Sequence, residues 1–338
     1  MAKYPLLRRI AERILAELAR GAGKYPLLFQ RLADRTSSEL ERALVPSDLY
    51  GAGYFDPKAP AIADQKASGY ADYRRETSNL DVAAYVVFKH LRPQRVLDIG
   101  SARGFLLEAF ADLGVDAFGV DISHYAVVLA KDTARRRVVV GSATDLPFQA
   151  GGAPVVTLFE TLEHLPPRVV ADALREIYRA TSGFVVATIP SFGPNEHGPD
   201  GWFAGKVRWD ALERYETLDR DYEGPIPFHD LMRDKEGNPI EGHVTIASFS
   251  WWTKRFAEAG LIRCGELEER MNPDLGRFGL LGDQIWHLYV FRKLEVAVPE
   301  AVPLSDEEIA QAETLLNLVT GSQGASGQTP GTAMPTIG

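Results

Sequence analysis

The chain has 338 residues, of which 45% are hydrophobic and 25% charged, and its formal charge is −9 at pH 7. This composition predicts one large buried core plus extensions. The negative charge offers no chain-wide basic surface, so a long nucleic acid is disfavoured as a partner. The single cysteine, Cys264, excludes an intrachain disulfide, and no stretch has the pattern of a transmembrane segment or signal peptide. We therefore expect a cytoplasmic protein.

The N-terminal part predicts helices followed by a loop. Residues 5–20 place apolar side chains on one helical face, and the letters Lys-Tyr-Pro-Leu-Leu at 3–7 recur at 24–28, which predicts a second, similar helix start. Residues 46–79 are rich in Pro, Gly, Asp and Tyr and predict an ordered loop that leads to a helix over 80–91.

The next segment, Val-Leu-Asp-Ile-Gly-Ser-Ala-Arg-Gly at 96–104, predicts a buried strand that turns sharply into a helix over 105–113. Gly100 and Gly104 permit backbone geometry and close approach that a side chain would block. In open α/β sheets, ligands bind beyond the carboxyl ends of strands, where helix N-termini present backbone N–H groups. We therefore predict a ligand site at this turn.

Acidic residues recur at the ends of the following strands. Residues 115–121 predict a second strand that ends in Asp121, and a third strand at 138–140 leads to Asp145. A carboxylate at such a position can accept hydrogen bonds from both ribose hydroxyls. Together with the glycine turn, this order predicts a parallel βαβ sheet that holds a nucleoside.

The glycine turn favours one class of nucleoside cofactor. Gly100, Ala102 and Gly104 lack the third glycine of the dinucleotide fingerprint, so a nicotinamide cofactor is the second choice. With Asp98, the segment resembles motif I of class I S-adenosylmethionine (SAM) dependent methyltransferases, D-x-G-x-G-x-G, with Ala102 in place of the middle glycine.

This resemblance implies SAM as the cofactor and an α/β fold with a Rossmann-like seven-stranded sheet. Asp145-Leu-Pro-Phe148 resembles the adenine-binding segment of the family, and residues 68–73 resemble a segment that folds over the cofactor. Packing of those tyrosines against the core is an equal alternative. The implied cofactor contacts are Asp98, Gly100, Ala102, Gly104, Asp121, Ile122, Ala143, Asp145, Leu146, Glu160 and Tyr73.

The chain is predicted to have three parts. Residues 1–79 form an N-terminal helical extension with the cofactor-covering loop, 80–295 the SAM-binding methyltransferase domain, and 296–338 a C-terminal helix with a disordered tail from residue 321. An insertion at 191–245 follows the fifth strand, and its length predicts an acceptor-binding region. The remaining elements predicted in this half are strands at 155–159, 184–189, 261–267 and 285–291 and helices at 169–180, 250–260 and 305–319.

The residues directly after the fourth strand have catalytic character. Glu160, Glu163 and His164 are spaced i, i+3 and i+4, which predicts one shared face of a helical turn beside the cofactor. Two carboxylates and an imidazole on such a face indicate either a divalent-metal site or a proton-transfer site.

The Glu-x-x-Glu-His pattern resembles the metal-binding motif of ubiquinone-biosynthesis O-methyltransferases and of small-RNA 2'-O-methyltransferases. In the latter family, a further histidine after the fifth strand completes a Mg²⁺ site, and His243 occupies a comparable place. The resemblance implies Glu160, Glu163, His164 and His243 as ligands of Mg²⁺ or another divalent cation. Glu-His pairs at this place also occur in methyltransferases without metal, and Glu163 would then cap or brace the helix. If no metal binds, His164 or His243 is the expected base.

The sequence therefore predicts a SAM-dependent O-methyltransferase, with Glu160, His164 and His243 as catalytic residues. The expected acceptor is a hydroxyl of a small molecule or a glycan, and divalent-metal assistance is one of two open mechanisms. A metal-independent N- or C-methyltransferase of a small metabolite and a non-catalytic SAM-binding regulator are the alternatives. A homodimer is compatible with the amphipathic helix at 5–20.

Overall fold

The computed structural model describes residues 50, 54, 73–192, 206–208, 224–233, 239–277 and 288–323. The helices predicted at 5–20 and from 24–28 lie outside the described residues, as does most of the tail predicted from residue 321. The three-part division of the chain stays a prediction.

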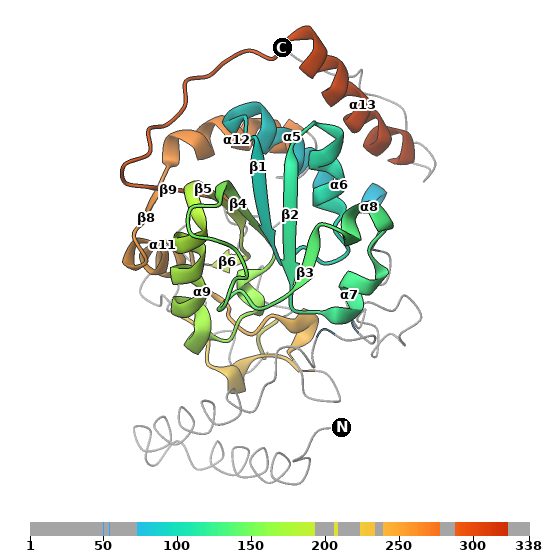
Figure 1. The fold of residues 1–338 in the computed structure, drawn as a ribbon. Coiled ribbons are helices and arrows are strands. Elements are labelled where there is room, and N and C mark those ends of the chain that lie inside the picture. Colours follow the sequence, from blue (N-terminus) through green and yellow to red (C-terminus); the bar gives the residue numbers. More distant parts are fainter. Residues whose placement is uncertain are drawn as a thin grey trace, which may run out of the picture.

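A seven-stranded sheet forms the centre of the molecule, in the order β3-β2-β1-β4-β5-β9-β8 (Figure 1). The first five strands run parallel, and β9 is antiparallel to both β5 and β8. The predicted α/β fold with a Rossmann-like sheet is thereby confirmed. The strands are β1 (Arg95–Ile99), β2 (Asp116–Asp121), β3 (Val138–Val140), β4 (Ala153–Phe159), β5 (Thr181–Thr188), β8 (Leu261–Arg263) and β9 (Leu288–Lys293).

Helices cover both faces of the sheet (Figure 1). Helices α5 (Leu80–Leu91), α6 (Phe105–Asp112) and α12 (Gly265–Arg277) contribute to one hydrophobic core, and α9 (Pro167–Ala180) and α11 (Phe249–Glu258) contribute to the other. Successive strand residues point to opposite faces, so Val96 belongs to the first core and its neighbour Leu97 to the second. The other elements are α7 (His124–Leu129), α8 (Asp132–Arg135), α13 (Asp306–Gln323), β6 (Ser191–Phe192) and β7 (Ala247–Ser248).

Two predictions in the C-terminal half are wrong at their boundaries. The strand predicted at 261–267 ends at Arg263, because Leu267, Met271 and Leu275 recur at helical spacing and bury one face of α12. The predicted tail starts at residue 321, but residues 321–323 belong to α13, which extends to Gln323. None of the described helices is long and apolar enough to cross a membrane.

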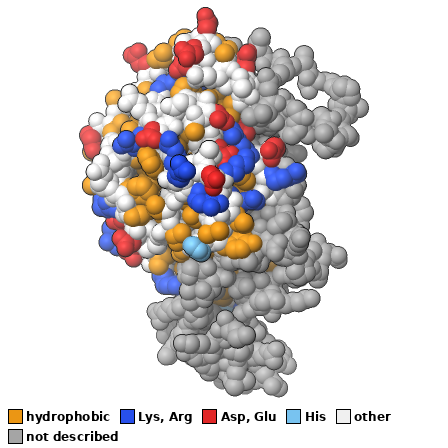
Figure 2. All heavy atoms as spheres, turned by 45° about the vertical axis from the view of Figure 1, so that its right-hand side comes forward, with side chains coloured by type: hydrophobic (Ala, Val, Ile, Leu, Met, Phe, Trp, Pro, Cys, Tyr) orange, Lys and Arg blue, Asp and Glu red, His pale blue; other side chains and the backbone are white. Residues whose placement is uncertain are grey.

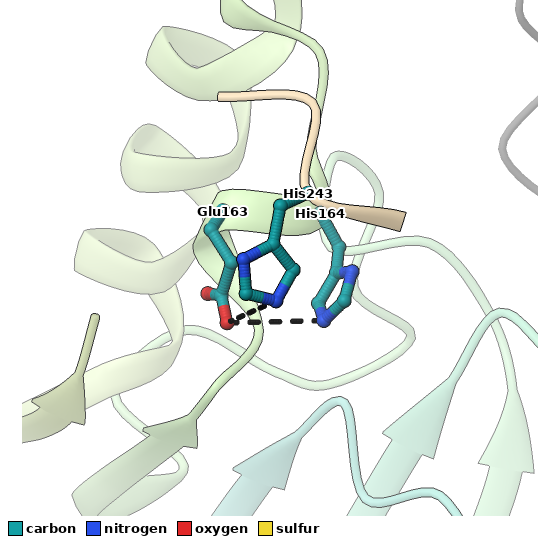
Figure 3. Close-up of side chains that lie close together, drawn as sticks. All are labelled: Glu163, His164 and His243. Carbon is teal, nitrogen blue, oxygen red and sulfur yellow. Dashed lines mark ion pairs between the residues drawn. The ribbon is translucent and has the colours of Figure 1, made fainter. Parts of the chain in front are cut away.

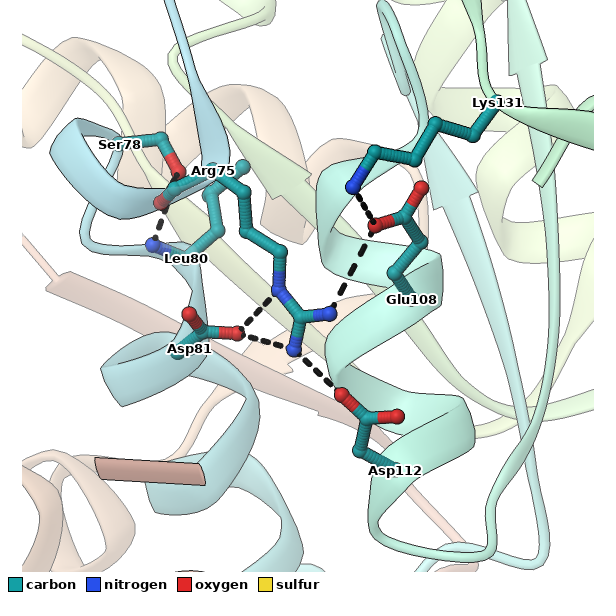
Figure 4. Close-up of polar contacts among 7 residues, drawn as sticks. All are labelled: Arg75, Ser78, Leu80, Asp81, Glu108, Asp112 and Lys131. Atoms are coloured by element: carbon teal, nitrogen blue, oxygen red, sulfur yellow. Dashed lines mark hydrogen bonds and ion pairs between the residues drawn. The ribbon is translucent and has the colours of Figure 1, made fainter. Parts of the chain in front are cut away.

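Arg75, in the segment before α5, forms ion pairs with acidic residues of α5 and α6 (Figure 4). Its guanidinium donates to Asp81 Oδ1 at 2.7 and 2.9 Å and to Asp112 Oδ2 at 2.6 Å, and it lies 3.6 Å from Glu108 Oε2. Arg103 Nη1 donates to the carbonyl oxygen of Tyr73 at 3.0 Å. These contacts hold the loop that carries Tyr73 against α6, beside the glycine turn.

Candidate active site

The glycine turn between β1 and α6 has the sharp geometry that the sequence predicts. Gly100 and Gly104 have φ angles of 81° and 77°. A Cβ atom at Gly100 would lie 2.4 Å from Thr161 Oγ1, and one at Gly104 would lie 2.7 Å from Ala134 Cβ. Both positions therefore admit glycine alone, for conformational and for steric reasons.

Asp121, at the carboxyl end of β2, closes this turn. Its Oδ2 accepts a hydrogen bond from the backbone N–H of Ala102, and its Oδ1 accepts one from the N–H of Ser123, both at 2.7 Å. Burial raises the pKa of Asp121, and the two backbone donors oppose that rise. A carboxylate has about four acceptor positions, so two remain for the hydroxyls of a nucleoside.

Asp98 lies deeper in the sheet. Its Oδ1 accepts a hydrogen bond from Thr157 Oγ1 of β4 at 2.8 Å. Burial, with a smaller contribution from the charge of Asp121, raises the pKa of Asp98 to about 7. The two acids of the cofactor half are thus both held by hydrogen bonds from their own chain.

The other predicted cofactor residues lie in two different places. Tyr73 and Ile122 pack against a small cluster that contains Ala102. Asp145 and Leu146 follow β3, where Asp145 is exposed and Leu146 is buried. The same cluster includes Tyr50, which the sequence reasoning missed. The assignment of Ala143, Asp145 and the rest as SAM contacts stays a prediction.

Glu163, His164 and His243 converge beyond the carboxyl end of β4; we call these three the acid–histidine cluster (Figure 3). One ligand atom from each lies within 4.8 Å of the others. His164 Nε2 is 3.8 Å and His243 Nε2 is 4.0 Å from Glu163 Oε1. Both imidazoles therefore direct the same nitrogen toward one carboxylate.

Backbone hydrogen bonds bring the distant His243 to this place. Glu163 and His164 lie in a short 3-10 turn, Leu162–His164, and the carbonyl oxygen of Glu163 accepts the N–H groups of Val244 and Thr245 at 2.9 Å each. The structure thus places His243 beside the motif after β4, and its role as a ligand stays a prediction.

Glu160 does not share a helical face with Glu163 and His164, so that prediction is wrong. Its φ angle of 52° is left-handed, and the 3-10 turn begins only at Leu162. Thr161 Oγ1 donates hydrogen bonds to the carbonyl oxygens of Ile99 and Phe159. These bonds hold the chain at Thr161 outside the 3-10 turn. Glu160 is not a member of the three-residue cluster, and its role as a ligand stays a prediction.

Three carboxylate oxygens of this region are buried without a hydrogen-bond partner, although Glu160 also has a side-chain hydrogen bond with Thr188. Among the described residues, no donor reaches Glu163 Oε1, Glu163 Oε2 or Glu160 Oε1. Burial raises the pKa of Glu160 to about 8 and that of Glu163 well above its ordinary value, with the charge of Glu160 adding to the second rise. Buried polar atoms are normally hydrogen-bonded, so these oxygens indicate a place for a ligand.

Both histidines of the cluster are neutral. Burial lowers the pKa of His164 to about 4 and that of His243 well below its ordinary value. His164 Nδ1 lies 3.1 Å from the carbonyl oxygen of Gly242, and this acceptor assigns the proton to Nδ1. The lone pair of Nε2 then points to Glu163, as a metal ligand requires.

Lys206, from the insertion, is a second residue that sequence reasoning missed. Its side chain is 12% exposed and forms an ion pair with Glu241. The charge of Lys206 opposes the rise in the pKa values of Glu160 and Glu163, but burial outweighs it. No local motif marks this lysine, because its partners are distant in the sequence.

The residues of the cluster fit a divalent cation. A buried carboxylate with open oxygens and two neutral imidazoles form a donor set that such ions bind. The imidazoles favour ions such as Mn²⁺, Fe²⁺ or Zn²⁺ over Mg²⁺, which prefers oxygen ligands.

Comparisons with known proteins identify part of this chain as a methyltransferase domain. Residues 97–183 match a family model described as the methyltransferase domain. The match begins in β1 and ends in β5, so it includes the glycine turn and Asp121 as well as Glu163 and His164. His243 and Lys206 lie beyond it.

Curated relatives match part of the chain. A demethylmenaquinone methyltransferase from Renibacterium salmoninarum is 34% identical over 109 residues, which are 30% of this chain and 44% of that protein. A ubiquinone biosynthesis O-methyltransferase from Paraburkholderia phymatum is 33% identical over 97 residues, which are 27% of this chain and 42% of that protein. The chain thus spans less than half the length of these relatives.

Among solved structures, a SAM-dependent methyltransferase from Methanosarcina mazei has 19% sequence identity and a TM-score of 0.41. The likeness covers 59% of this chain and 92% of that one. The family match, the strand order, and the glycine turn with its partner acid Asp121 show that the chain contains a class I SAM-dependent methyltransferase domain.

Proposed function

We propose that this protein is a SAM-dependent O-methyltransferase that acts on a small molecule with two adjacent hydroxyl groups. The observation that carries the proposal is the acid–histidine cluster, which lies at the same edge of the sheet as the glycine turn. A hydroxyl is a weak nucleophile, so its methylation needs a group that removes the hydroxyl proton or lowers the pKa of the hydroxyl. A cluster with this donor set serves that need.

The side chains have distinct parts in the proposed reaction. Glu163, His164 and His243 would hold a divalent cation, which lowers the pKa of a hydroxyl in contact with it and fixes its orientation. Glu160, whose pKa is raised to about 8, is ionised in a minority of molecules at neutral pH, and this ionised form is the base proposed to accept the hydroxyl proton. His164, with its pKa lowered to about 4, is too weak a base for this step at neutral pH. Both histidines are therefore assigned to binding.

The cofactor half supplies alignment. The glycine turn and Asp121 would hold the nucleoside so that the sulfonium methyl group faces the acceptor oxygen in line. Because the methyl group is already electrophilic, placement of the two reactants supplies most of the remaining rate acceleration.

The names of the relatives narrow the acceptor class. Proteins named ubiquinone biosynthesis O-methyltransferase and demethylmenaquinone methyltransferase each match about 100 residues of this chain. We therefore propose a ring with neighbouring hydroxyls, such as a catechol, as the first acceptor to test. A sugar diol, free or in a glycan, is the second.

The test is methyl transfer from isotopically labelled SAM to catechols, sugar diols and amines. We expect a catechol or diol to be methylated, the activity to fall by about 90% or more in EDTA, and Mn²⁺ or Mg²⁺ to restore it. Binding of S-adenosylhomocysteine (SAH), measured by titration calorimetry in the same buffers, should not change. Transfer to amines alone, or full activity in EDTA, would contradict the proposal.

A further inference from the structure

Tyr50 contacts both halves of the active site, although it lies about 50 residues before β1. On the cofactor side, its backbone carbonyl oxygen accepts a hydrogen bond from Ser123 Oγ at 2.5 Å. Ser123 in turn donates its backbone N–H to Asp121, the acid that closes the glycine turn. The main chain of Tyr50 is therefore hydrogen-bonded to Ser123, two residues after the predicted ribose-binding acid.

The side chain of Tyr50 reaches the acid–histidine cluster. Its hydroxyl lies 3.2 Å from the carbonyl oxygen of Gly242 and 3.3 Å from that of His164, and donates its proton to these carbonyls. The ring packs edge-on against the His164 imidazole, with 5.4 Å between centroids. Tyr50 is thus in contact with both the ring and the backbone of His164.

The Gly242 carbonyl links this hydroxyl to the chemistry of the cluster. The same oxygen accepts the Nδ1 proton of His164 at 3.1 Å, so its position decides which nitrogen of His164 carries the proton. A Cβ atom at Gly242 would lie 3.1 Å from Tyr50 Cε1 and 3.2 Å from His164 Nδ1. The glycine therefore permits a close approach of the three groups that a larger residue would push apart.

We propose that Tyr50 is a positioning residue for His164, which holds the Gly242 carbonyl so that His164 keeps its proton on Nδ1 and presents Nε2 to the cation and acceptor. The role of His164 Nε2 rests on the proposed function. The control of the His164 tautomer by Tyr50 does not depend on it. Because the main chain of Tyr50 is bonded to Ser123, this arrangement also ties the cluster to the cofactor half.

The structure offers a matched pair of variants for the test. Tyr50→Phe removes the hydroxyl and keeps the ring and the backbone bond to Ser123. Tyr54→Phe is the control, because Tyr54 donates its hydroxyl to the carbonyl oxygen of Glu241, the residue before Gly242, at 3.1 Å and its ring packs edge-on against Tyr50. Each change deletes one phenolic oxygen near the same loop.

The first readout is the ¹⁵N NMR spectrum of the histidine rings in metal-free, SAH-bound protein. We expect wild type and Tyr54→Phe to show His164 as a single Nδ1–H tautomer, and Tyr50→Phe to show a mixture of tautomers. A His164 spectrum that is unchanged in Tyr50→Phe, or equally changed in both variants, would overturn the proposal.

The second readout is Mn²⁺ affinity by calorimetry. It should fall about 10-fold in Tyr50→Phe, as is typical when a group that orients a ligand is lost, with SAH affinity within about 3-fold of wild type. A tautomer change in protein that binds no metal would support the role of Tyr50 and refute metal assistance. Wild-type Mn²⁺ affinity in a Tyr50→Phe protein with mixed tautomers would overturn the link to the cation.

Discussion

The two halves of the active site differ in how many hydrogen bonds the chain itself donates to the buried acidic side chains. In the cofactor half, Asp121 accepts two backbone N–H groups and Asp98 accepts a threonine hydroxyl. In the acid–histidine cluster, both oxygens of Glu163 are buried without a hydrogen bond from any described residue. A buried carboxylate without such donors is costly. The acids of the cofactor half are therefore held by the chain itself, whereas the cluster has open oxygens to which the proposed cation would bind.

The largest effect is expected from Glu163→Gln, which breaks the cluster and leaves the cofactor half intact. The amide keeps the shape of the side chain but removes the charge that a cation needs. Methyl transfer should fall at least about 100-fold, because the proposed hydroxyl activation depends on this ligand. Glu266→Gln is the control, since Glu266 is largely exposed on α12.

In Glu163→Gln, the affinity for SAH should stay at the wild-type value. A parallel loss of SAH binding and of activity would show that the two halves are not separate, which would contradict the comparison.

The converse change, Asp121→Asn, should weaken the cofactor half alone. An amide oxygen can accept only one of the two backbone bonds cleanly, and the other N–H then faces an NH₂ group. An unsatisfied buried donor costs about 1–3 kcal/mol, so SAH affinity should fall roughly 10- to 100-fold. Mn²⁺ affinity should not change.

Asp116→Asn is the matched control for this variant, because Asp116 lies at the other end of β2 and its side chain is 40% exposed. Calorimetry with SAH and with Mn²⁺ distinguishes the outcomes. A variant that loses Mn²⁺ but keeps SAH would reverse the assignment.

Asp98 predicts a dependence of stability on pH. Burial raises its pKa from 3.8 to about 7 in the folded protein, so the folded state holds this proton more tightly than the unfolded state does. The stability due to that proton is complete below pH 3.8 and is lost as the pH rises through 7.

The variant Asp98→Asn keeps an acceptor for Thr157 and has no charge to desolvate. Its free energy of unfolding, relative to wild type, should therefore increase by about 2–3 kcal/mol between about pH 5 and about pH 8. Urea unfolding at the two values measures this difference. An equal effect at both would show that Asp98 titrates normally.

The smallest effect is expected from Ala102→Gly, which restores the middle glycine of the motif. Ala102 has a φ angle of 45°, a region that is costly for residues with a Cβ atom. Relief of this strain is partly offset by the greater freedom of glycine in the unfolded chain, so we expect stability to rise by about 1 kcal/mol or less. Thermal unfolding measures the change, and a lower melting temperature would contradict it.

Local features of the cofactor half could be predicted from sequence because its contacts are local. Gly100 and Asp121 follow directly from a strand, a turn and the next strand in order. Glu160 was misplaced because residue spacing assumes a continuous helix, while a left-handed residue and the Thr161 hydrogen bonds delay the turn.

The contacts of the cluster that escaped prediction are those made across long stretches of chain. Tyr50 is 192 residues from Gly242, and no period or motif in the sequence connects them. His243 was found only through a resemblance, since its approach depends on backbone bonds to Glu163. The fold could be predicted from the sequence pattern, whereas the full set of residues in the site could be found only from the three-dimensional structure.

The most direct test of the account is pulsed EPR of Mn²⁺ added to the SAH-bound protein. The account predicts one tightly bound Mn²⁺ per chain with ¹⁴N coupling from imidazole, and loss of that coupling in a His164→Ala, His243→Ala double variant that still binds SAH. A wild-type protein that binds SAH but shows no bound Mn²⁺, or bound Mn²⁺ without nitrogen coupling, would contradict the claim that the acid–histidine cluster is a cation site.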